Sequence, residues 1–171
     1  MLRLAKAFWD IAFWRQSPER LPASPFLLGL AAATVGSLEI VGAFLPPYSS
    51  GRLLVRVALS AGLPVAWSWA VLRIAGRRAR FLQTSIALLG VAAFAQLALY
   101  PLGSLLNVLG THHPAAIPLG LVSFGVLLWY LSASAHIWRA ALESGMVLGA
   151  AVSLGYLLVS IVLEQQLLPD S

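Results

Sequence analysis

One carboxylate lies inside a long apolar segment where few other side chains could support acid–base or ion chemistry. Glu39 stands in the stretch TVGSLEIVGAFLPP, with no other charged residue between Arg20 and Arg52. An ionised carboxylate inside a membrane costs at least about 2–3 kcal/mol and must face protein or water. Glu39 therefore predicts an ion pair, a protonated carboxyl group with hydrogen-bonded neighbours, or a carboxylate that handles a proton or an ion.

Arg56 and Gln96 are the side chains that we expect to meet Glu39. The chain turns back through LPPYSSGRLL, so Arg56 comes near the depth of Glu39 about one turn into the next apolar segment. We favour an ion pair between these two residues, and a hydrogen bond from Gln96 is the alternative. Gln96, Tyr100 and Asn107 share one helical face, where interhelical hydrogen bonding is a simpler explanation than a substrate site.

The sequence contains no set of side chains for nucleophilic, phosphate or metal chemistry. The chain has no Cys, and Walker, GxSxG and HExxH motifs are missing. His112 and His113 are adjacent, so they do not converge on one metal ion, and no Cys, Asp or Glu nearby completes a ligand set. His136 is the least unsuitable catalytic candidate. We predict a protein that is not an enzyme, with no catalytic residue, metal or cofactor.

The composition requires lipid as part of the solvent. Of the 171 residues, 60% are hydrophobic and 10% are charged, whereas a soluble domain devotes about a quarter of its residues to charge. Runs of about 20 apolar residues can cross the hydrocarbon core as helices. We expect an all-α integral membrane protein with five spans at 26–45, 53–73, 82–106, 116–138 and 144–163. Four spans plus a re-entrant segment is the alternative, because the polar step at 136–144 is short.

Residues 1–24 are expected to form a cytoplasmic leader before a single transmembrane domain at 25–171. In MLRLAKAFWDIAFWRQ, Arg3, Lys6 and Asp10 share one helical face, and apolar side chains cover much of the rest. This pattern is typical of an amphipathic helix that lies in the headgroup region. The prolines of SPERLPASP end that helix.

The basic residues predict the orientation. With the N-terminus inside, nine of the 11 Lys and Arg residues lie on the cytoplasmic side and two lie outside. The positive-inside rule then places the N-terminus in the cytoplasm and the C-terminus outside a cell inner membrane. The cytoplasmic cluster is expected to contact anionic lipid headgroups, at about 1 kcal/mol for each arginine; it consists of Arg73, Arg77, Arg78 and Arg80. Because this patch is short and lies at the bilayer surface, we do not expect nucleic acid as a partner.

Small residues predict where helices approach closely. Gly36 lies one turn before Glu39, and the last span repeats small residues at four-residue spacing: Gly145, Gly149 and Ser153. Such ridges serve internal packing, a partner protein or self-association, and all three remain open. A comparable ridge on the first span consists of Gly29, Ala33 and Ser37. Packing of these two spans on each other is one option.

Three sequence features and the layout carry a family resemblance. They are FWRQSPERLPASPFLLGL, RFLQTSIALLG and the late pair Gly155–Tyr156. With five closely spaced spans after a short leader, the chain resembles the bacterial Yip1-like family. This resemblance implies the membrane-organising or trafficking-adaptor role of eukaryotic members, whereas bacterial members are largely without an assigned activity. The DLYGP stretch of the eukaryotic members is missing, so a small GTPase is not an expected partner.

These observations together predict a non-enzymatic inner-membrane protein that acts as a subunit, an adaptor or a membrane-organising protein. Its expected partners are anionic headgroups at the cytoplasmic face and either a membrane protein or a second copy of the chain. The alternative is a small oligomeric transporter or channel in which Glu39 and Gln96 line a polar path. A membrane enzyme ranks third.

Overall fold

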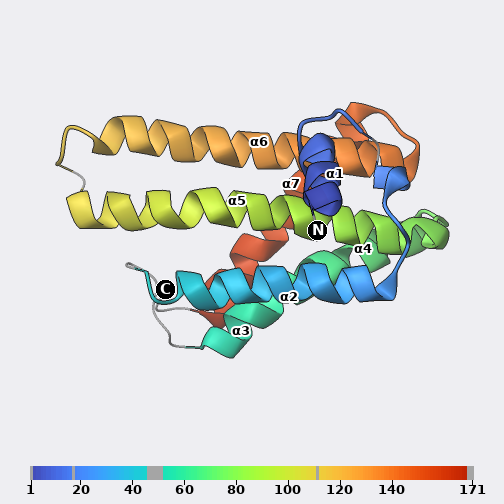
Figure 1. Ribbon diagram of the computed structural model, residues 1–171, viewed down its shortest axis with the longest axis horizontal. Coiled ribbons are helices and arrows are strands. Elements are labelled where there is room, and N and C mark those ends of the chain that lie inside the picture. Colours follow the sequence, from blue (N-terminus) through green and yellow to red (C-terminus); the bar gives the residue numbers. More distant parts are fainter. Residues whose placement is uncertain (1, 17, 46–51, 111, 169–171) are drawn as a thin grey trace.

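The computed structural model describes residues 2–16, 18–45, 52–110 and 112–168, and within these ranges every regular element is a helix. The predicted loop PPYSSG at 46–51 lies outside the described residues. The elements, shown in Figure 1, are α1 (Leu2–Ala12), η1 (Pro18–Arg20), α2 (Pro25–Gly42), α3 (Leu53–Val57), η2 (Ala58–Gly62), α4 (Leu63–Ile74), η3 (Arg78–Arg80), α5 (Phe81–Leu109), α6 (Ala116–Leu142) and α7 (Met146–Leu167).

The five helical segments that are long and apolar enough to cross a membrane confirm the predicted fold class. They are Pro25–Gly42, Leu53–Ile74, Arg78–Leu109, Ala116–Leu142 and Met146–Leu167. The re-entrant alternative is wrong, because α6 and α7 are two separate long helices. Glu143 separates them in a left-handed conformation with φ 49°.

The last two helices extend further than the polarity of their ends predicted. α6 continues to Leu142, so most of the polar step at 136–144 is helical, and α7 continues to Leu167 rather than ending at 163. In α6, Ile137, Trp138 and Ala141 are buried against other helices. Packing therefore keeps this segment helical beyond the point where its polar residues suggested an end.

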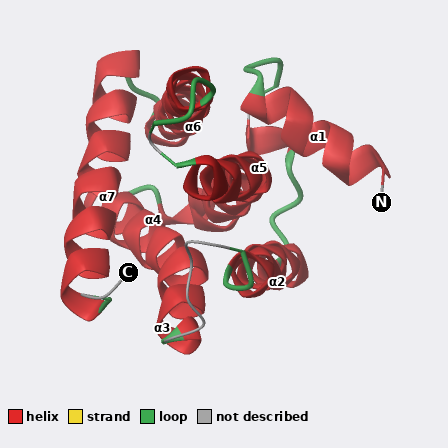
Figure 2. Cartoon of the chain, turned by 90° about the vertical axis from the view of Figure 1, so that its left-hand side faces the viewer, coloured by secondary structure: helices red, strands yellow, loops and turns green. Residues whose placement is uncertain are grey.

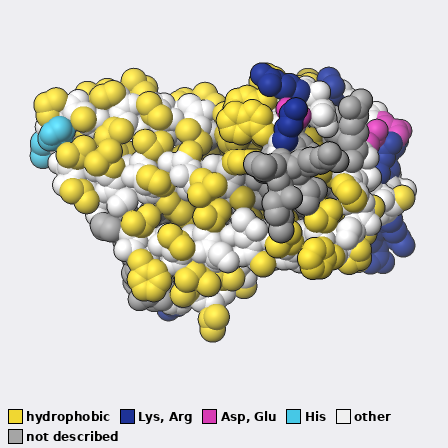
Figure 3. Space-filling view, viewed as in Figure 1, with side chains coloured by type: hydrophobic (Ala, Val, Ile, Leu, Met, Phe, Trp, Pro, Cys, Tyr) yellow, Lys and Arg dark blue, Asp and Glu magenta, His cyan; other side chains and the backbone are white. Residues whose placement is uncertain are grey.

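α5 lies at the centre of the bundle, between α2 and α6 (Figure 1). In Figure 2, α2, α5 and α6 are seen nearly end-on, whereas α7 runs across the view. α7 therefore crosses the bundle obliquely, from α6 at its beginning toward α3 at its end. Figure 3 shows Lys and Arg side chains gathered at one end, which we call the arginine-rich end, and His side chains at the opposite end, the histidine end.

The buried core lies in the half of the bundle toward the arginine-rich end. Its members from α4, α5 and α6 include five side chains with 0–1% of their surface exposed: Leu72, Ile86, Val91, Ile137 and Trp138. Toward the histidine end, α5 and α6 continue beyond α2 (Figure 1) and expose apolar side chains such as Val108 and Ile117. Exposure of this kind is expected where lipid replaces water as the solvent.

Helix α1 packs on α5 and α6 and contributes to the core. Ile11 and Ala12 are buried, and the indole nitrogen of Trp129 donates a hydrogen bond to the Ala12 carbonyl at 3.2 Å. The Phe8 ring lies so close to α5 that a Cβ atom on Gly90 would be 2.3 Å from it. α1 is thus anchored by protein contacts, and its predicted contact with lipid headgroups remains a prediction.

Two residues of the predicted basic face of α1 lie in different surroundings. Lys6 is exposed, whereas Asp10 is buried and accepts a hydrogen bond from the Gln16 side chain at 3.3 Å. The side chain of Arg3 lies outside the described part of the chain. α1 also ends at Ala12, earlier than the 16-residue stretch suggested.

The ridge on α7 packs inside the molecule. A Cβ atom on Gly149 would lie 2.3 Å from the Ala135 carbonyl oxygen, and Ser153 is buried. Gly145, at the start of the helix, has no atom within 4 Å of such a position. On α2, Gly36 approaches the Val57 side chain, with a Cβ distance of 3.2 Å.

Packing of the α2 ridge against α7 does not occur, because α7 crosses obliquely and uses its small residues against α6. The ridge residues of α2 are instead exposed: Gly29, Ala33 and Ser37. The first and last spans are therefore not packing partners along their ridges.

Candidate functional site

Two adjoining cavities lie between the spans near the C-terminal ends of α2 and α7. Their volumes are about 190 and 240 Å³. We call the two together the carboxylate cavity, because the carboxylates of Glu39 and Glu164 line both. The other residues that line both are Leu59, Ser60 and Gln96. Four different spans thus contribute to one polar space within a set of apolar helices.

Glu39 and Gln96, both predicted as site residues, are hydrogen-bonded to each other. The Gln96 Nε2 atom donates to the Glu39 Oε1 atom at 3.4 Å. The other amide atom, Gln96 Oε1, is buried and has no hydrogen-bond partner among the described residues. Since a carbonyl oxygen only accepts, this atom can accept a hydrogen bond from a protonated carboxyl group or a water molecule.

Arg56 lines the larger cavity together with Glu39 and Glu164. The ion pairs among the described side chains do not include one between Glu39 and Arg56. The three charged side chains instead share one cavity, to which α7 contributes Glu164 as a second carboxylate.

Glu164 is the site residue that the sequence analysis missed, because the last span was predicted to end at residue 163. It lies inside α7, in a line with Tyr156 and Ser160 at four-residue spacing, and all three line the smaller part of the cavity. That spacing on one helical face was the available signal. Glu164 is more exposed than the half-buried Glu39, so it stands nearer the opening of the cavity.

Two local features of the second span bring these groups together. Arg52 Nη1 donates to the Leu167 carbonyl oxygen at 2.6 Å and joins the end of α7 to the start of α3. Ser60 belongs to η2, a π-helical turn that ends two residues before Pro64. Pro64 has no N–H for the Ser60 carbonyl, so regular α-helical bonding is interrupted at this point. π-helical turns of this kind are frequent at functional sites.

The charge balance of the cavity determines what it can hold. Among the described residues that line it, Glu39 and Glu164 carry two negative charges when ionised, and Arg56 carries one positive charge. An unbalanced charge in surroundings of low polarity is costly. One additional positive charge restores the balance, either as a proton on a carboxyl group or as a monovalent cation between the oxygen atoms.

At the arginine-rich end, Arg77 and Arg80 bind protein groups. Both form ion pairs with Glu143, and Arg80 pairs with Glu19 at 3.1 Å. Arg80 also donates to the carbonyl oxygens of Ala140 and Ala141, the latter at 3.4 Å, at the end of α6. The hydrogen bond from Arg77, with the charges of both arginines, lowers the pKa of Glu143 below its ordinary value.

The other two arginines of the predicted headgroup cluster are exposed. Arg73 places its guanidinium carbon 4.8 Å from the centre of the Trp69 ring, and Arg78 lies at the surface. Contact of this cluster with lipid headgroups stays a prediction. Because Arg77 and Arg80 form ion pairs with protein groups, Arg73 and Arg78 are the more accessible arginines of this cluster.

The histidines do not join the carboxylate cavity. His112 and His113 are exposed, and His113 Nδ1 accepts a hydrogen bond from the Ala115 amide at 3.1 Å. His136 is half-buried near the end of α6, and within the described chain its Nε2 atom has no hydrogen-bond partner. Among the described residues, no group of three or more His, Cys, Asp or Glu side chains could hold a metal ion.

Comparison with known proteins adds no family: no family model, no curated protein and no solved structure matches the chain. The Yip1-like resemblance therefore remains a prediction, and the proposals below rest on the geometry.

Proposed function

We propose that the chain is a small transporter or channel, acting as an oligomer, that binds a monovalent cation in the carboxylate cavity. The observation that carries this proposal is the meeting of Glu39, Glu164 and Arg56 in one cavity. Two carboxylates beside one guanidinium group favour the uptake of one more positive charge. Intramembrane carboxylates that face a cavity commonly mark ion or proton pathways.

In the proposed orientation the protein is a multi-pass protein of the cell inner membrane, with its N-terminus in the cytoplasm and its C-terminus outside. The bias of the basic residues supports this orientation. The arginine-rich end is then cytoplasmic, and the carboxylate cavity lies in the outer half of the protein. Glu164, near the opening, exchanges the cation with the outside, and Glu39 receives it further in.

The arrangement assigns a role to each polar group. Arg56 keeps one carboxylate ionised, because an opposite charge nearby favours the charged form. The second carboxylate then takes up and releases the cation. When Glu39 carries a proton, its carboxyl group can donate a hydrogen bond to Gln96 Oε1. This oxygen atom then has a hydrogen-bond partner that it lacks when Glu39 is ionised.

The test is cation flux into liposomes that contain the purified protein. Fluxes of protons, Na⁺ and K⁺ are measured under an imposed membrane potential. We expect Glu39→Gln and Glu164→Gln each to lower the flux of the conducted cation at least about tenfold, since removal of a proton-transfer group typically costs 10²–10⁴-fold. Glu19→Gln, the same chemical change outside the cavity, is the control.

The proposal fails if the wild-type protein conducts no cation above empty liposomes. It also fails if both cavity variants conduct as well as Glu19→Gln. Unfolding of each variant in mild detergent separates loss of flux from loss of folding.

A second candidate function is that of a non-enzymatic subunit, adaptor or membrane-organising protein, as the Yip1-like resemblance implies. The exposed ridge of Gly29, Ala33 and Ser37 on α2 favours it, because small residues let a helix of another protein or a second copy approach closely. A complex that survives gentle crosslinking in the wild type should be lost in Gly29→Leu. It should be kept in Gly120→Leu on α6, where a side chain also meets open space. Equal complexes in both variants would contradict this role.

A further inference from the structure

We infer that the monovalent cation of the carboxylate cavity is a primary alkylammonium ion with a short chain. Its charged group binds between Glu39 and Glu164, and its alkyl chain packs against leucine and tyrosine side chains of the smaller part of the cavity. This inference rests on the proposed function and deepens it, because it names the chemical class of the cation. The size, the lining and the charges of the cavity carry it.

The carboxylate cavity has the size of a site for a small organic molecule. Its two parts have volumes of about 190 and 240 Å³, and together they reach the range of about 300–1,000 Å³ that is typical of ligand pockets. A Na⁺ or K⁺ ion that binds without its water needs oxygen ligands on all sides. Leucine side chains line part of this space and offer no oxygen atom, so a ligand with an apolar part matches it better than a metal ion.

The smaller part of the cavity provides an apolar surface beside the two carboxylates. Tyr130 and Tyr156 contribute aromatic rings to this part and not to the larger one. Four leucines also line this part alone: Leu63, Leu99, Leu127 and Leu157. An alkyl chain that enters this space removes its own apolar surface from water, which favours binding. A hydrated metal ion gains nothing from the same surface.

The polar groups that line both parts match a primary ammonium group. Such a group has three N–H donors. The carboxylates of Glu39 and Glu164 are acceptors, and Gln96 Oε1 is a buried acceptor with no hydrogen-bond partner among the described residues. Gln96 Nε2 donates to Glu39 at 3.4 Å, so this amide lies directly beside a carboxylate. One ammonium group therefore supplies both the missing positive charge and a donor for Gln96.

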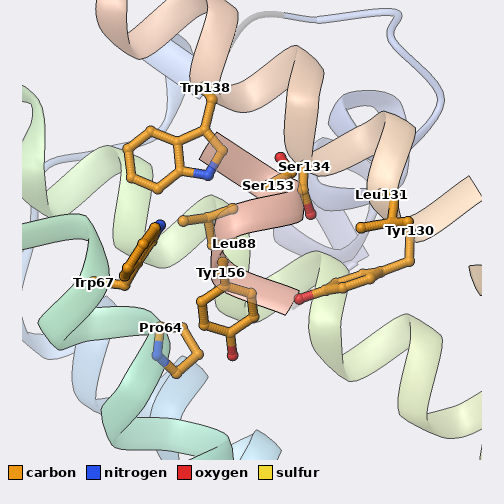
Figure 4. Close-up of a pocket in the computed structure, with 9 residues that line it drawn as sticks. All are labelled: Pro64, Trp67, Leu88, Tyr130, Leu131, Ser134, Trp138, Ser153 and Tyr156. Carbon is orange, nitrogen blue, oxygen red and sulfur yellow. The ribbon is translucent and has the colours of Figure 1, made fainter. Parts of the chain in front are cut away.

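The two tyrosines limit the length of the alkyl chain. Tyr156 and Glu164 are eight positions apart on α7, 164 minus 156, or about 12 Å along the helix. Beyond Tyr130 and Tyr156 lies a cavity of about 10 Å³, with room for about one water molecule; Figure 4 shows Tyr130 extending from α6 toward Tyr156. A short alkyl chain fits within this length, whereas the acyl chain of a lipid reaches about 15 Å, half of the hydrocarbon core.

Arg56 limits the ligand to one positive charge. It lines the larger part of the cavity together with Glu39 and Glu164. A second cationic group on the ligand would either meet this guanidinium group, which repels it, or lie unpaired among the leucines, where an isolated charge is costly. The cavity thus selects a monoamine over a diamine.

The experiment is isothermal titration calorimetry of the full-length protein in mild detergent with methyl-, propyl- and pentylammonium ions. Each added methylene group should tighten binding about fourfold, the factor that corresponds to its burial, so pentylammonium should bind about 250-fold more tightly than methylammonium. Pentan-1-ol has the same chain without the charge, and pentane-1,5-diammonium has a second charge. Both should bind at least about tenfold more weakly than pentylammonium.

Variants test the charged and the apolar contacts separately. Glu39→Gln and Glu164→Gln should each weaken the binding of pentylammonium at least about tenfold, whereas Glu19→Gln should not. Leu127→Ala should lower the preference for pentylammonium over methylammonium at least about fourfold, because Leu127 lines the apolar part. Leu128→Ala is the matched control, since the Leu128 side chain is exposed on the same helix. Unfolding in the same detergent identifies any variant that does not fold.

The outcomes distinguish this inference from the proposed function. Equal affinities for methylammonium and pentylammonium, or an affinity that neither carboxylate variant changes, would show that the alkylammonium ligand is wrong. The proposed function then still stands if protons, Na⁺ or K⁺ cross liposomes in dependence on Glu39 and Glu164. If phosphatidylethanolamine added to the detergent displaces pentylammonium, a lipid is the occupant and the inference is wrong. If alkylammonium ions bind as expected but no cation, pentylammonium included, crosses above empty liposomes, the binding site stands and the proposed transport is wrong.

Discussion

The contact between α6 and α7 at Gly149 allows a test of packing with a magnitude taken from the structure. A Cβ atom at this position would lie 2.3 Å from the Ala135 carbonyl oxygen and 3.0 Å from the Arg139 amide nitrogen. Ordinary contact begins at 3.4 Å, so Gly149→Ala requires the two helices to separate by about 1.1 Å, the difference between 3.4 and 2.3 Å. The atoms in the way belong to the backbone and cannot rotate aside.

We expect this overpacking to destabilise the protein by about 1–3 kcal/mol. Alanine also stabilises a helix interior relative to glycine by about 0.5–1 kcal/mol, and this gain must be removed from the comparison. Gly125→Ala on α6 is the matched control, because a Cβ atom there meets nothing within 4 Å. The difference between the two variants then reports the clash.

The assay is thermal unfolding in mild detergent, followed by the fluorescence of the six tryptophans. At about 2–4 °C for each kcal/mol in a chain of this length, Gly149→Ala should melt about 2–12 °C below Gly125→Ala. Equal melting temperatures would refute the inference that this backbone contact holds α7 on α6.

Three further predictions follow from contacts near the arginine-rich end and at α1. The hydrogen bond from Arg77 holds the pKa of Glu143 below its ordinary value. The stability that this group contributes is therefore present above the ordinary carboxyl pKa and is lost as the pH falls through the lower folded-state pKa. Glu143→Gln should remove this acid sensitivity, measured as melting temperature against pH. Gly90→Ala should displace the Phe8 ring, which lies where the new Cβ atom would be, and should therefore speed trypsin cleavage in α1. An unchanged cleavage rate would contradict the packing of α1 on α5. Arg80→Ala should destabilise the protein by about 1.5–3 kcal/mol in denaturant unfolding, whereas Arg78→Ala should stay within about 0.5 kcal/mol; equal effects would show that the Arg80 contacts contribute nothing.

The pattern of apolar runs was sufficient to predict the five spans, because the cost of exposing backbone polar groups to lipid leaves helices as the available form for such segments. The limits of the apolar runs also placed most span beginnings within a few residues of where the helices start. The ends of α6 and α7 were less predictable. Ile137 and Trp138 keep a polar segment helical through burial that depends on α4 and α5, and no local pattern contains that information.

The site shows the same division between local and long-range information. Glu39 was identifiable as a carboxylate in need of a partner, since the cost of burying its charge follows from its apolar neighbours alone. Its hydrogen bond from Gln96 was among the alternatives that residue type and depth suggested. The Arg56 pair was predicted from depth alone, and depth does not specify which side of a helix faces which neighbour.

What the chain's own pattern of residues decided was the number of spans, the helical class and the presence of one polar residue that needs protein around it. What the tertiary structure alone decided was the crossing of α7 over the bundle. That crossing follows from the close approach at Gly149 and from the bond between Arg52 and the end of α7. It brings Glu164 to Glu39, although 125 positions separate them in the sequence, 164 minus 39. Periodicity describes one helix at a time, and the angle between two helices depends on side chains from both.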